Sequence, residues 1–357
     1  MVGIESRVWE VYSHLKIGLP DVRVIGICGT GGIGKTTIAR VVYDSFSNQF
    51  EASSFLYNVR ETCERQGLVY LQKKLLSDIS MERNIRFESE AKGFQLIKHS
   101  QFNKKVFFVF DDVDDWFQLR NLVGESRWYG AGSRIIIATR DKQLLTRLKV
   151  DEIYSPAEMS NEEALRLFSL TCFGSERTPV DFKKLSNDFV SYAGGLPLAI
   201  KFLGSDLSCR KSVYEWMSTL DVFNRFPPRE LSQVFQISYD GLADSEKEIF
   251  LHMACFFNGE DQKRIVDILN SLRLLPQIGL KVLMDKSLLN LSLDKNGLWM
   301  HPLVQDMGRD MVYRECPDFP SRRSRLWSFK VIDKVLSRNK VSNLVEIFNL
   351  NIDPFYY

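Results

Sequence analysis

The chain has 357 residues, which is too long for one compact core and predicts two or three domains. With 45% apolar and 26% charged residues, the composition is typical of a globular protein. The 47 Lys and Arg residues nearly balance the 45 Asp and Glu residues, which leaves a formal net charge of +2. This balance excludes a general electrostatic attraction to nucleic acid or to an anionic membrane, so either partner would need a local patch.

The six cysteines are scattered and contain no CxxC pair, and several lie inside apolar runs. This pattern predicts reduced thiols in the core of a cytoplasmic protein, with the nucleus as the other compartment it allows. No stretch approaches the ~18 unbroken apolar residues of a membrane span. The first residues also lack the basic-then-apolar form of a secretion signal, so we expect no membrane partner.

A helix is predicted near the N-terminus, because apolar residues recur there at spacings of three and four from Val8 to Leu15. Residues 18–21 read Gly-Leu-Pro-Asp and should end it. An apolar run at 22–28 then predicts a buried strand. It passes directly into a glycine-rich turn at 29–34 and a second helix that begins at Lys35.

The turn matches the pattern G-x-x-x-x-G-K-[ST], in the strand-then-helix context that this pattern requires. Glycines let successive amide N–H groups approach a phosphate chain closely, and the following helix adds its positive N-terminus. Lys35 is expected to reach the β- and γ-phosphates, and the Thr36 hydroxyl is expected to bind Mg²⁺. The predicted phosphate-binding residues are Gly29, Gly31, Gly32, Ile33, Gly34, Lys35, Thr36 and Thr37.

Three further apolar runs, at 55–59, 106–110 and 135–138, predict strands. A helix between the first two places Leu68, Leu71, Leu75, Leu76 and Ile79 on one face. Apolar runs without alternation, separated by helices, indicate a parallel sheet that is covered on both sides. We therefore predict an α/β P-loop nucleotide-binding domain over residues 22–156, preceded by an N-terminal segment at 1–21.

Charged side chains follow two of these strands at the edge where parallel sheets bind ligands. Asp111 is expected to hold the Mg²⁺ shell, and Asp112 to orient or deprotonate an attacking water. Carboxylates in this position can instead cap helices or form turns. Arg140 follows the next strand and would sense a γ-phosphate, or would form a surface ion pair with Asp141.

Beyond about Pro156 the strand patterns give way to helical ones, at 162–168, 182–192 and 198–207. These predict a helical bundle domain over residues 157–228, with Pro227 and Pro228 at its end. A capping box at Ser245 and Glu248 predicts the start of a helix in the next domain, 229–315.

Further helices are predicted at 263–269 and 279–285, and two strands at 288–293 and 298–300 flank a turn at 294–297. Helices followed by a hairpin indicate a winged-helix domain. The tail at 316–357 is assigned as a linker, in which residues 341–348 could form the first strand of a further domain.

In this order, the motifs resemble the NB-ARC module of plant disease-resistance proteins, over most of the chain from Val2 to about Trp327. They are closest to the subgroup with a TIR domain in front and leucine-rich repeats behind. The motifs that carry the resemblance are those at 29–37, 55–61, 110–114, 132–141, 195–199 and 254–257, with Met300 and His301.

The resemblance implies a nucleotide switch of the STAND ATPase class, closed with ADP, opened by exchange to ATP and then self-associating. Slow hydrolysis through Lys35, Asp111, Asp112 and Arg140 would reset it. Partners would be the TIR and leucine-rich-repeat domains of a longer receptor. Residues implied to contact the nucleotide besides the phosphate turn are Val2 and Ile4 at the adenine, Pro197 with Leu198 pressing on it, and His301 at the ADP β-phosphate.

One position departs from the family pattern, which reads Met-His-Asp where this chain has Met300, His301 and Pro302. Proline is well tolerated in the first turn of a helix, and it restricts the preceding residue to extended backbone angles. The carboxylate is absent, which predicts a weakened ADP-bound state and either leaky activation or a degenerate receptor. A lone histidine at a strand end is otherwise most often a structural one.

Two other functions remain open at this stage. One is an ATP-dependent winged-helix regulator that binds DNA through the arginine-rich segment at 322–325, although such clusters are usually solvated surfaces or linkers and nucleic acid is not favoured. The other is an ADP-binding fragment that does not hydrolyse ATP.

Overall fold

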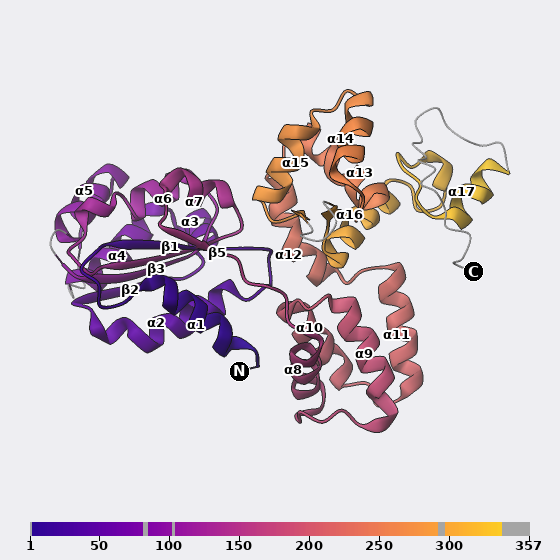
Figure 1. Cartoon of the computed structure of the whole chain (residues 1–357), viewed down its shortest axis with the longest axis horizontal. Helices are drawn as coiled ribbons and strands as arrows, with labels where there is room; N and C mark the ends of the chain where they lie inside the picture. The colour runs from indigo at the N-terminus through magenta and orange to yellow at the C-terminus, as the bar shows by residue number, and fades with distance from the viewer. Residues whose placement is uncertain (1, 81–84, 102–103, 292–296, 338–357) are drawn as a thin grey trace. The chain divides into compact units, whose positions relative to one another are not determined.

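The computed structural model describes residues 2–80, 85–101, 104–291 and 297–337, and the chain divides into two compact units (Figure 1). The first unit contains Met1–Leu167 together with Leu196–Leu198. The second contains Phe168–Gly195 and Ala199–Tyr357. No helix in the described part of the chain is both long and apolar enough to cross a lipid bilayer.

A five-stranded parallel sheet forms the centre of the first unit, with the strand order β2-β3-β4-β1-β5. This confirms the predicted P-loop α/β fold, in which the strand before the glycine turn lies inside the sheet. The short strand β5 was not predicted, because its first residue is exposed and it has no apolar run. The strands are β1 (Arg23–Cys28), β2 (Ala52–Leu56), β3 (Val106–Val113), β4 (Arg134–Thr139) and β5 (Glu152–Tyr154).

The sheet is buried on both faces, and alternate side chains of β3 show how. Phe107 and Val109 point into the apolar cluster under α1 (Ile4–Leu15) and α2 (Lys35–Phe46), and Phe108 and Phe110 point into the cluster on the other face. Figure 1 shows the two helix layers on opposite sides of the sheet. The second layer contains α3 (Val59–Gln66), α4 (Leu68–Ser80), α5 (Glu90–Gln101), α6 (Trp116–Leu122) and α7 (Lys142–Leu148).

The strand predicted at 55–59 is misplaced. The observed strand β2 covers Ala52–Leu56, because Asn58 adopts a left-handed conformation with φ 47° and α3 begins at the next residue. A strand cannot continue through a left-handed residue. The start of β2 was missed because Ala52, Ser53 and Ser54 carry no apolar run, although two of them are buried in the sheet.

In the second unit, Trp216 organises a helical bundle. Its side chain is 1% exposed, lies against the rings of Phe168, Phe182 and Phe189, and donates its indole N–H to the Arg210 carbonyl at 3.1 Å. Trp216 lies on α11, a helix that the sequence did not predict. The helices from here are α8 (Asn161–Phe173), α9 (Lys183–Ala193), α10 (Pro197–Ser208) and α11 (Val213–Arg225), and the first residues of α8 and α10 belong to the first unit.

The rest of the second unit has the helices and hairpin expected of a winged helix. Strands β6 (Asn290–Leu291) and β7 (Leu298–Trp299) pair antiparallel, as predicted, and most of the turn between them lies outside the described residues. The strand considered at 341–348 also lies outside them. The helices are α12 (Arg229–Asp240), α13 (Asp244–His252), the π-helical η4 (Met253–Phe257), α14 (Gln262–Ser271), α15 (Pro276–Asp285), α16 (Pro302–Glu315) and α17 (Phe329–Leu336).

The predicted capping box at Ser245 and Glu248 is wrong by two residues. Helix α13 begins at Asp244, and the Glu246 carboxylate accepts a hydrogen bond from the Ala243 backbone N–H at 2.8 Å. Glu246 therefore does the capping. Glu248 instead forms an ion pair with Arg325.

The arginine-rich segment at 322–325 is neither a solvated surface nor an open DNA-binding patch. Arg323 is 6% exposed and donates to the carbonyls of Cys316 at 2.9 Å and Pro317 at 2.8 Å. Arg325 is 2% exposed and pairs with Glu248. Only Arg322 of the three arginines is exposed.

None of the six cysteines forms a disulfide, in agreement with the prediction of reduced thiols. Cys28, Cys172 and Cys255 are buried, as expected for core residues. Cys209, the residue after the end of α10 at Ser208, is exposed. The prediction of core thiols is therefore wrong for this residue.

Replacing Arg325 with Met should lower the free energy of unfolding of the second unit by about 1–3 kcal/mol, because it removes a buried charged hydrogen bond to Glu248. The exposed Arg322→Met variant is the matched control and should change it little. Thermal unfolding followed by circular dichroism measures both. Equal shifts in the two variants would show that the burial of Arg325 has no energetic consequence.

Candidate functional site

The glycine turn at 29–34 joins β1 to α2 at the carboxyl edge of the parallel sheet. Gly32 and Gly34 both adopt left-handed angles, with φ 83° and φ 102°. A Cβ on Gly32 would also lie 2.9 Å from the Leu198 Cβ, whereas one on Gly34 would meet nothing within 4 Å. The Leu198 N–H donates to the Gly32 carbonyl at 3.2 Å. The structure therefore brings Leu198 to the phosphate turn, and Pro197 precedes it in the same unit.

Lys35 is buried at the first position of α2, and its ammonium group bridges its own loop. The Nζ atom donates to the carbonyls of Gly29 at 2.6 Å and Thr30 at 3.0 Å. Burial and, next, the nearby positive charge of Arg140 lower the pKa of Lys35 to about 8. A phosphate chain lying on this loop would exchange these two neutral acceptors for an anion.

The side chains of Thr36 and Asp111, which the sequence predicts as magnesium ligands, meet in the structure. The Thr36 hydroxyl donates to Asp111 Oδ1 at 2.8 Å, which connects α2 to β3. Asp111 is 1% exposed, and burial raises its pKa to about 6. Its second oxygen, Oδ2, is buried and has no hydrogen-bond partner among the described groups.

A hydroxyl oxygen next to an unsatisfied carboxylate oxygen suits Mg²⁺, which takes hard oxygen ligands. Among the described residues, no three His, Cys, Asp or Glu side chains come together as a protein-only metal cage would need. Mg²⁺ typically uses one or two protein ligands and completes its shell with water and substrate phosphates. The residues present therefore fit this ion.

A bulge at the end of β3 places Asp112 separately from Asp111. The register between β3 and β4 shifts between Phe110 and Val113, and Asp112 adopts φ 55°. Its two carboxylate oxygens face two arginines: Oδ2 accepts from Arg60 Nε at 3.2 Å, and Oδ1 lies 3.5 Å from Arg140 Nε. In a regular strand the side chains of Asp111 and Asp112 would point to opposite faces of the sheet. The bulge changes the direction of Asp112 from that regular position.

Arg140 thus faces the site, and Asp141 caps α7 by accepting from the Gln143 N–H at 2.9 Å. Burial lowers the pKa of Arg140, and the carboxylate of Asp112 opposes this shift. Arg60 was not assigned a role from the sequence. It lies four residues beyond the end of β2, in the first turn of α3, so the rule that singled out Arg140 would have found it only if extended to the first turn of the helix that follows a strand.

The N-terminal segment is tied to the first unit by Arg7. Its guanidinium pairs with both oxygens of Glu163, at 3.0 Å and 3.2 Å. This holds the start of α1, where Ile4 is half-buried against the core, next to half-buried Val2. Their contact with an adenine ring stays a prediction.

His301 belongs to the second unit, where Asn258 and α16 fix its position. The Asn258 side chain accepts from the Met300 N–H at 2.7 Å and donates to the Met300 carbonyl at 3.3 Å. The π-helical turn η4 leaves the Ala254 carbonyl available to Gln305 and Arg309 of α16, at 3.0 Å and 3.1 Å. Contacts therefore hold both the residue before His301 and the helix after it.

Both ring nitrogens of His301 have partners within the second unit. Nδ1 accepts from the Leu303 N–H at 3.2 Å and caps α16, so Nε2 carries the proton that it shares with the Gly194 carbonyl at 3.1 Å. The side chain is 3% exposed. Pro302 is the first residue of α16, and His301 has φ −55° and ψ 137°, which confirms the predicted tolerance of proline and the extended backbone before it.

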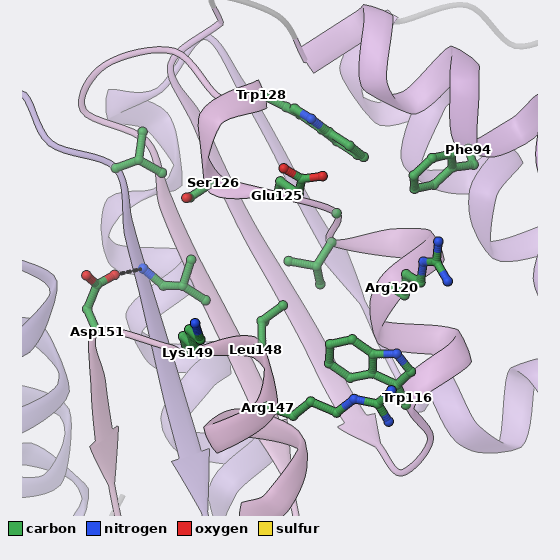
Figure 2. A pocket seen from close by; sticks show the side chains of 14 residues that line it. Phe94, Trp116, Arg120, Glu125, Ser126, Trp128, Arg147, Leu148, Lys149 and Asp151 are labelled. Atoms are coloured by element: carbon green, nitrogen blue, oxygen red, sulfur yellow. Dashed lines mark hydrogen bonds between the residues drawn. The ribbon is translucent and has the colours of Figure 1, made fainter.

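A separate cavity of about 530 Å³ lies in the first unit, beside the start of β1. Val24 of β1 and Asp151, next to the start of β5, line it, whereas the glycine turn follows the end of β1. Figure 2 shows Trp116 beside Arg147, which lies 4.0 Å from the ring centroid. None of the predicted site residues lines this cavity, so it is not the phosphate site.

Two family models match the chain. The model described as "NB-ARC domain" matches residues 4–178, and that described as "Disease resistance protein Roq1-like, winged-helix domain" matches residues 243–316. The solved structure of Aeropyrum pernix ORC2 (ADPNP-ADP complexes) has a TM-score of 0.49 and 14% identity over 87% of this chain and 93% of its own. That likeness is too distant to inform function.

Curated relatives are similar over nearly the whole chain. Disease resistance protein RUN1 of Vitis rotundifolia is 43% identical, over 99% of this chain and 26% of its own length. TMV resistance protein N of Nicotiana glutinosa is 39% identical, over 95% and 30%, and RPP2B of Arabidopsis thaliana is 35% identical, over 98% and 28%. The chain thus spans less than a third of each relative, and it belongs to the NB-ARC family in the form found in plant disease resistance proteins.

Proposed function

We propose that the chain is the nucleotide-dependent switch of a plant immune receptor, bound to ADP at rest and to ATP when active. The observation that carries this proposal is the meeting of Lys35, the Thr36–Asp111 pair and Arg140 at one edge of the sheet. Together they offer a cation for the phosphates, ligands for Mg²⁺ and an arginine for the terminal phosphate.

Slow ATP hydrolysis would reset the switch. Asp112 is the residue proposed to orient or deprotonate water, and both of its oxygens face arginines. A carboxylate engaged in this way has to release a partner before it can accept a proton from water, which supports a slow rate. A fragment that binds ADP without hydrolysing ATP would have the same nucleotide contacts and differs only in turnover.

The remaining nucleotide contacts are proposed from the family resemblance. Val2 and Ile4 would border the adenine, with Pro197 and Leu198 pressing on it, and His301 would reach the ADP β-phosphate. For that last contact, Nε2 would have to give up the Gly194 carbonyl. The corresponding domains are proposed as 22–156 for the P-loop domain, 157–228 for the helical domain and 229–315 for the winged helix, with 1–21 and 316–357 as flanking segments.

The proposed partners follow from the same switch. They are an adenine nucleotide, further copies of the receptor after activation, and the TIR and leucine-rich-repeat domains of a longer protein in the cytoplasm or nucleus. A DNA-binding regulator is less well supported, because Arg323 and Arg325 are buried in contacts with the protein. A DNA shift assay at low salt separates the two, since phosphate contacts give strongly salt-dependent binding.

Purified protein should retain ADP or ATP, identified by chromatography of the acid extract.

Lys35→Ala should weaken nucleotide binding measured by calorimetry by about a hundredfold, because it removes the charged contact with the phosphates. Asp111→Asn should weaken binding in Mg²⁺ but not in EDTA. Lys142→Ala, an exposed lysine on α7, is the control. A folded protein that binds no adenine nucleotide would refute the proposed function.

Gly194→Ala should displace His301, because the new Cβ would lie 2.6 Å from Nε2. Gly174→Ala is the matched control: it has a similar φ of 66° but no neighbour within 4 Å. Both variants carry the strain of a left-handed alanine. Only Gly194→Ala should shift the His301 ring signals in ¹H–¹³C NMR spectra, and unchanged signals there would show that the ring does not depend on this contact.

Pro302→Asp should slow ADP release by about tenfold, the effect of one added charged hydrogen bond of about 1.4 kcal/mol next to His301. An acidic residue is also favourable in the first turn of α16. Pro302→Ala removes the ring without adding the carboxylate and should leave the rate near that of the original protein. Stopped-flow release of a fluorescent ADP analogue measures it, and identical rates for the two variants would contradict the role of the missing carboxylate.

A further inference from the structure

We propose that Arg60 is a positioning residue, which holds Asp112 while Arg140 exchanges the Asp112 carboxylate for the γ-phosphate of ATP. This inference rests on the proposed function and adds a residue and a ligand exchange to it. It comes from a juxtaposition that the sequence did not predict: one carboxylate between two arginines at the carboxyl edge of the sheet, beside Lys35.

The three side chains form a half-buried cluster. Asp112 is 17% exposed, Arg60 17% and Arg140 20%, so water screens their charges only in part. The two arginines come from different elements: Arg60 from the start of α3, and Arg140 from the end of β4. Without Asp112 between them they would repel each other, and this repulsion acts on the pKa of Arg140.

The backbone of Asp112 indicates that this arrangement is held in place. A non-glycine residue at φ 55° costs about 1–2 kcal/mol relative to ordinary angles. Such strain persists where the surrounding contacts hold the conformation in place. Here the guanidinium groups of Arg60 and Arg140 both contact the Asp112 side chain. The bulge in β3 thereby places the Asp112 carboxylate between the guanidinium groups of Arg60 and Arg140, where it offsets their mutual repulsion.

The two arginines do not hold Asp112 equally. Arg60 makes the shorter contact, at 3.2 Å from its Nε to Asp112 Oδ2, and another nitrogen of its guanidinium lies 3.5 Å from Glu64 on the same helix. Arg140 lies at 3.5 Å. It follows Thr139, whose carbonyl accepts a hydrogen bond from the Gly29 N–H at 3.4 Å, so it lies next to the phosphate turn. Arg140 is therefore the arginine that can turn to a bound anion.

The binding of ATP and the binding of ADP should affect the cluster of Arg60, Asp112 and Arg140 differently. The γ-phosphate of ATP competes with Asp112 for Arg140, whereas ADP lacks this group and leaves the three-residue cluster intact. When Arg140 leaves, Arg60 remains as the counterion of Asp112, so that two anions do not face each other unpaired. Asp112 Oδ1 is then open to a water molecule. Arg60 thus favours the binding of ATP without touching the nucleotide.

The test compares ATP with ADP. Arg60→Gln should lower the affinity for ATP by about tenfold and leave that for ADP unchanged, because only ATP leaves Asp112 without a counterion. Arg60→Lys keeps the charge and should restore most of the loss. Arg65→Gln is the matched control, since Arg65 lies on the same helix, pairs with Glu61 and is 74% exposed. Calorimetric titration of each variant with ADP and with a non-hydrolysable ATP analogue, both with Mg²⁺, supplies the affinities.

A double variant makes the test sharper. Asp112→Asn alone should raise the ATP-to-ADP affinity ratio, because it releases Arg140. In Arg60→Gln with Asp112→Asn no carboxylate is left without a partner, so the ratio should return to at least the original value. Equal effects of Arg60→Gln on both nucleotides, or a double variant as poor for ATP as Arg60→Gln, would overturn the inference. If the unaltered protein binds neither nucleotide, the proposed function itself fails.

Discussion

The parallel alignment of β1, β3 and β4 is the constraint on which the rest of the site depends. Because parallel strands end at one edge of the sheet, the residues that follow them meet there although they are far apart in the chain. The hydrogen bond of 2.8 Å from Thr36 to Asp111 is the direct sign of this meeting. It joins the helix after the glycine turn to the third strand, and it leaves one buried carboxylate oxygen without a partner.

Around that bond, charged groups are balanced against one another at short range. Lys35 is held by backbone carbonyls, and Asp112 by two arginines. Each of these contacts is one that a nucleotide with its metal ion could replace, because each joins a charged group to a partner from the protein itself. The contacts of the site are therefore ones that a bound nucleotide could exchange, which agrees with the proposed switch.

In the second unit, the same principle applies to one histidine. His301 caps α16 with one nitrogen and donates to the Gly194 carbonyl with the other. Asn258 holds the residue before it, and the π-helical turn contacts α16 after it. A structural role for His301 is thus observed. Its proposed role at a phosphate would use the same Nε2–H group. His301 could therefore contact either the Gly194 carbonyl or the phosphate at a given moment, but not both. The proline after it is accommodated at the first position of the helix.

The sequence alone determined the glycine turn, the parallel sheet and the placement of Lys35, Thr36, Asp111 and Arg140 at one edge of that sheet, because these depend on local patterns and on the edge rule for parallel strands. Only the tertiary structure decided the position of β2, the helix that carries Trp216, and the burial of Arg323 and Arg325, since each depends on contacts between residues that are distant in the chain. The pairing of Arg60 with Asp112 belongs to the same class. A backbone bulge with a positive φ leaves no trace in residue type, yet it determines which charges meet.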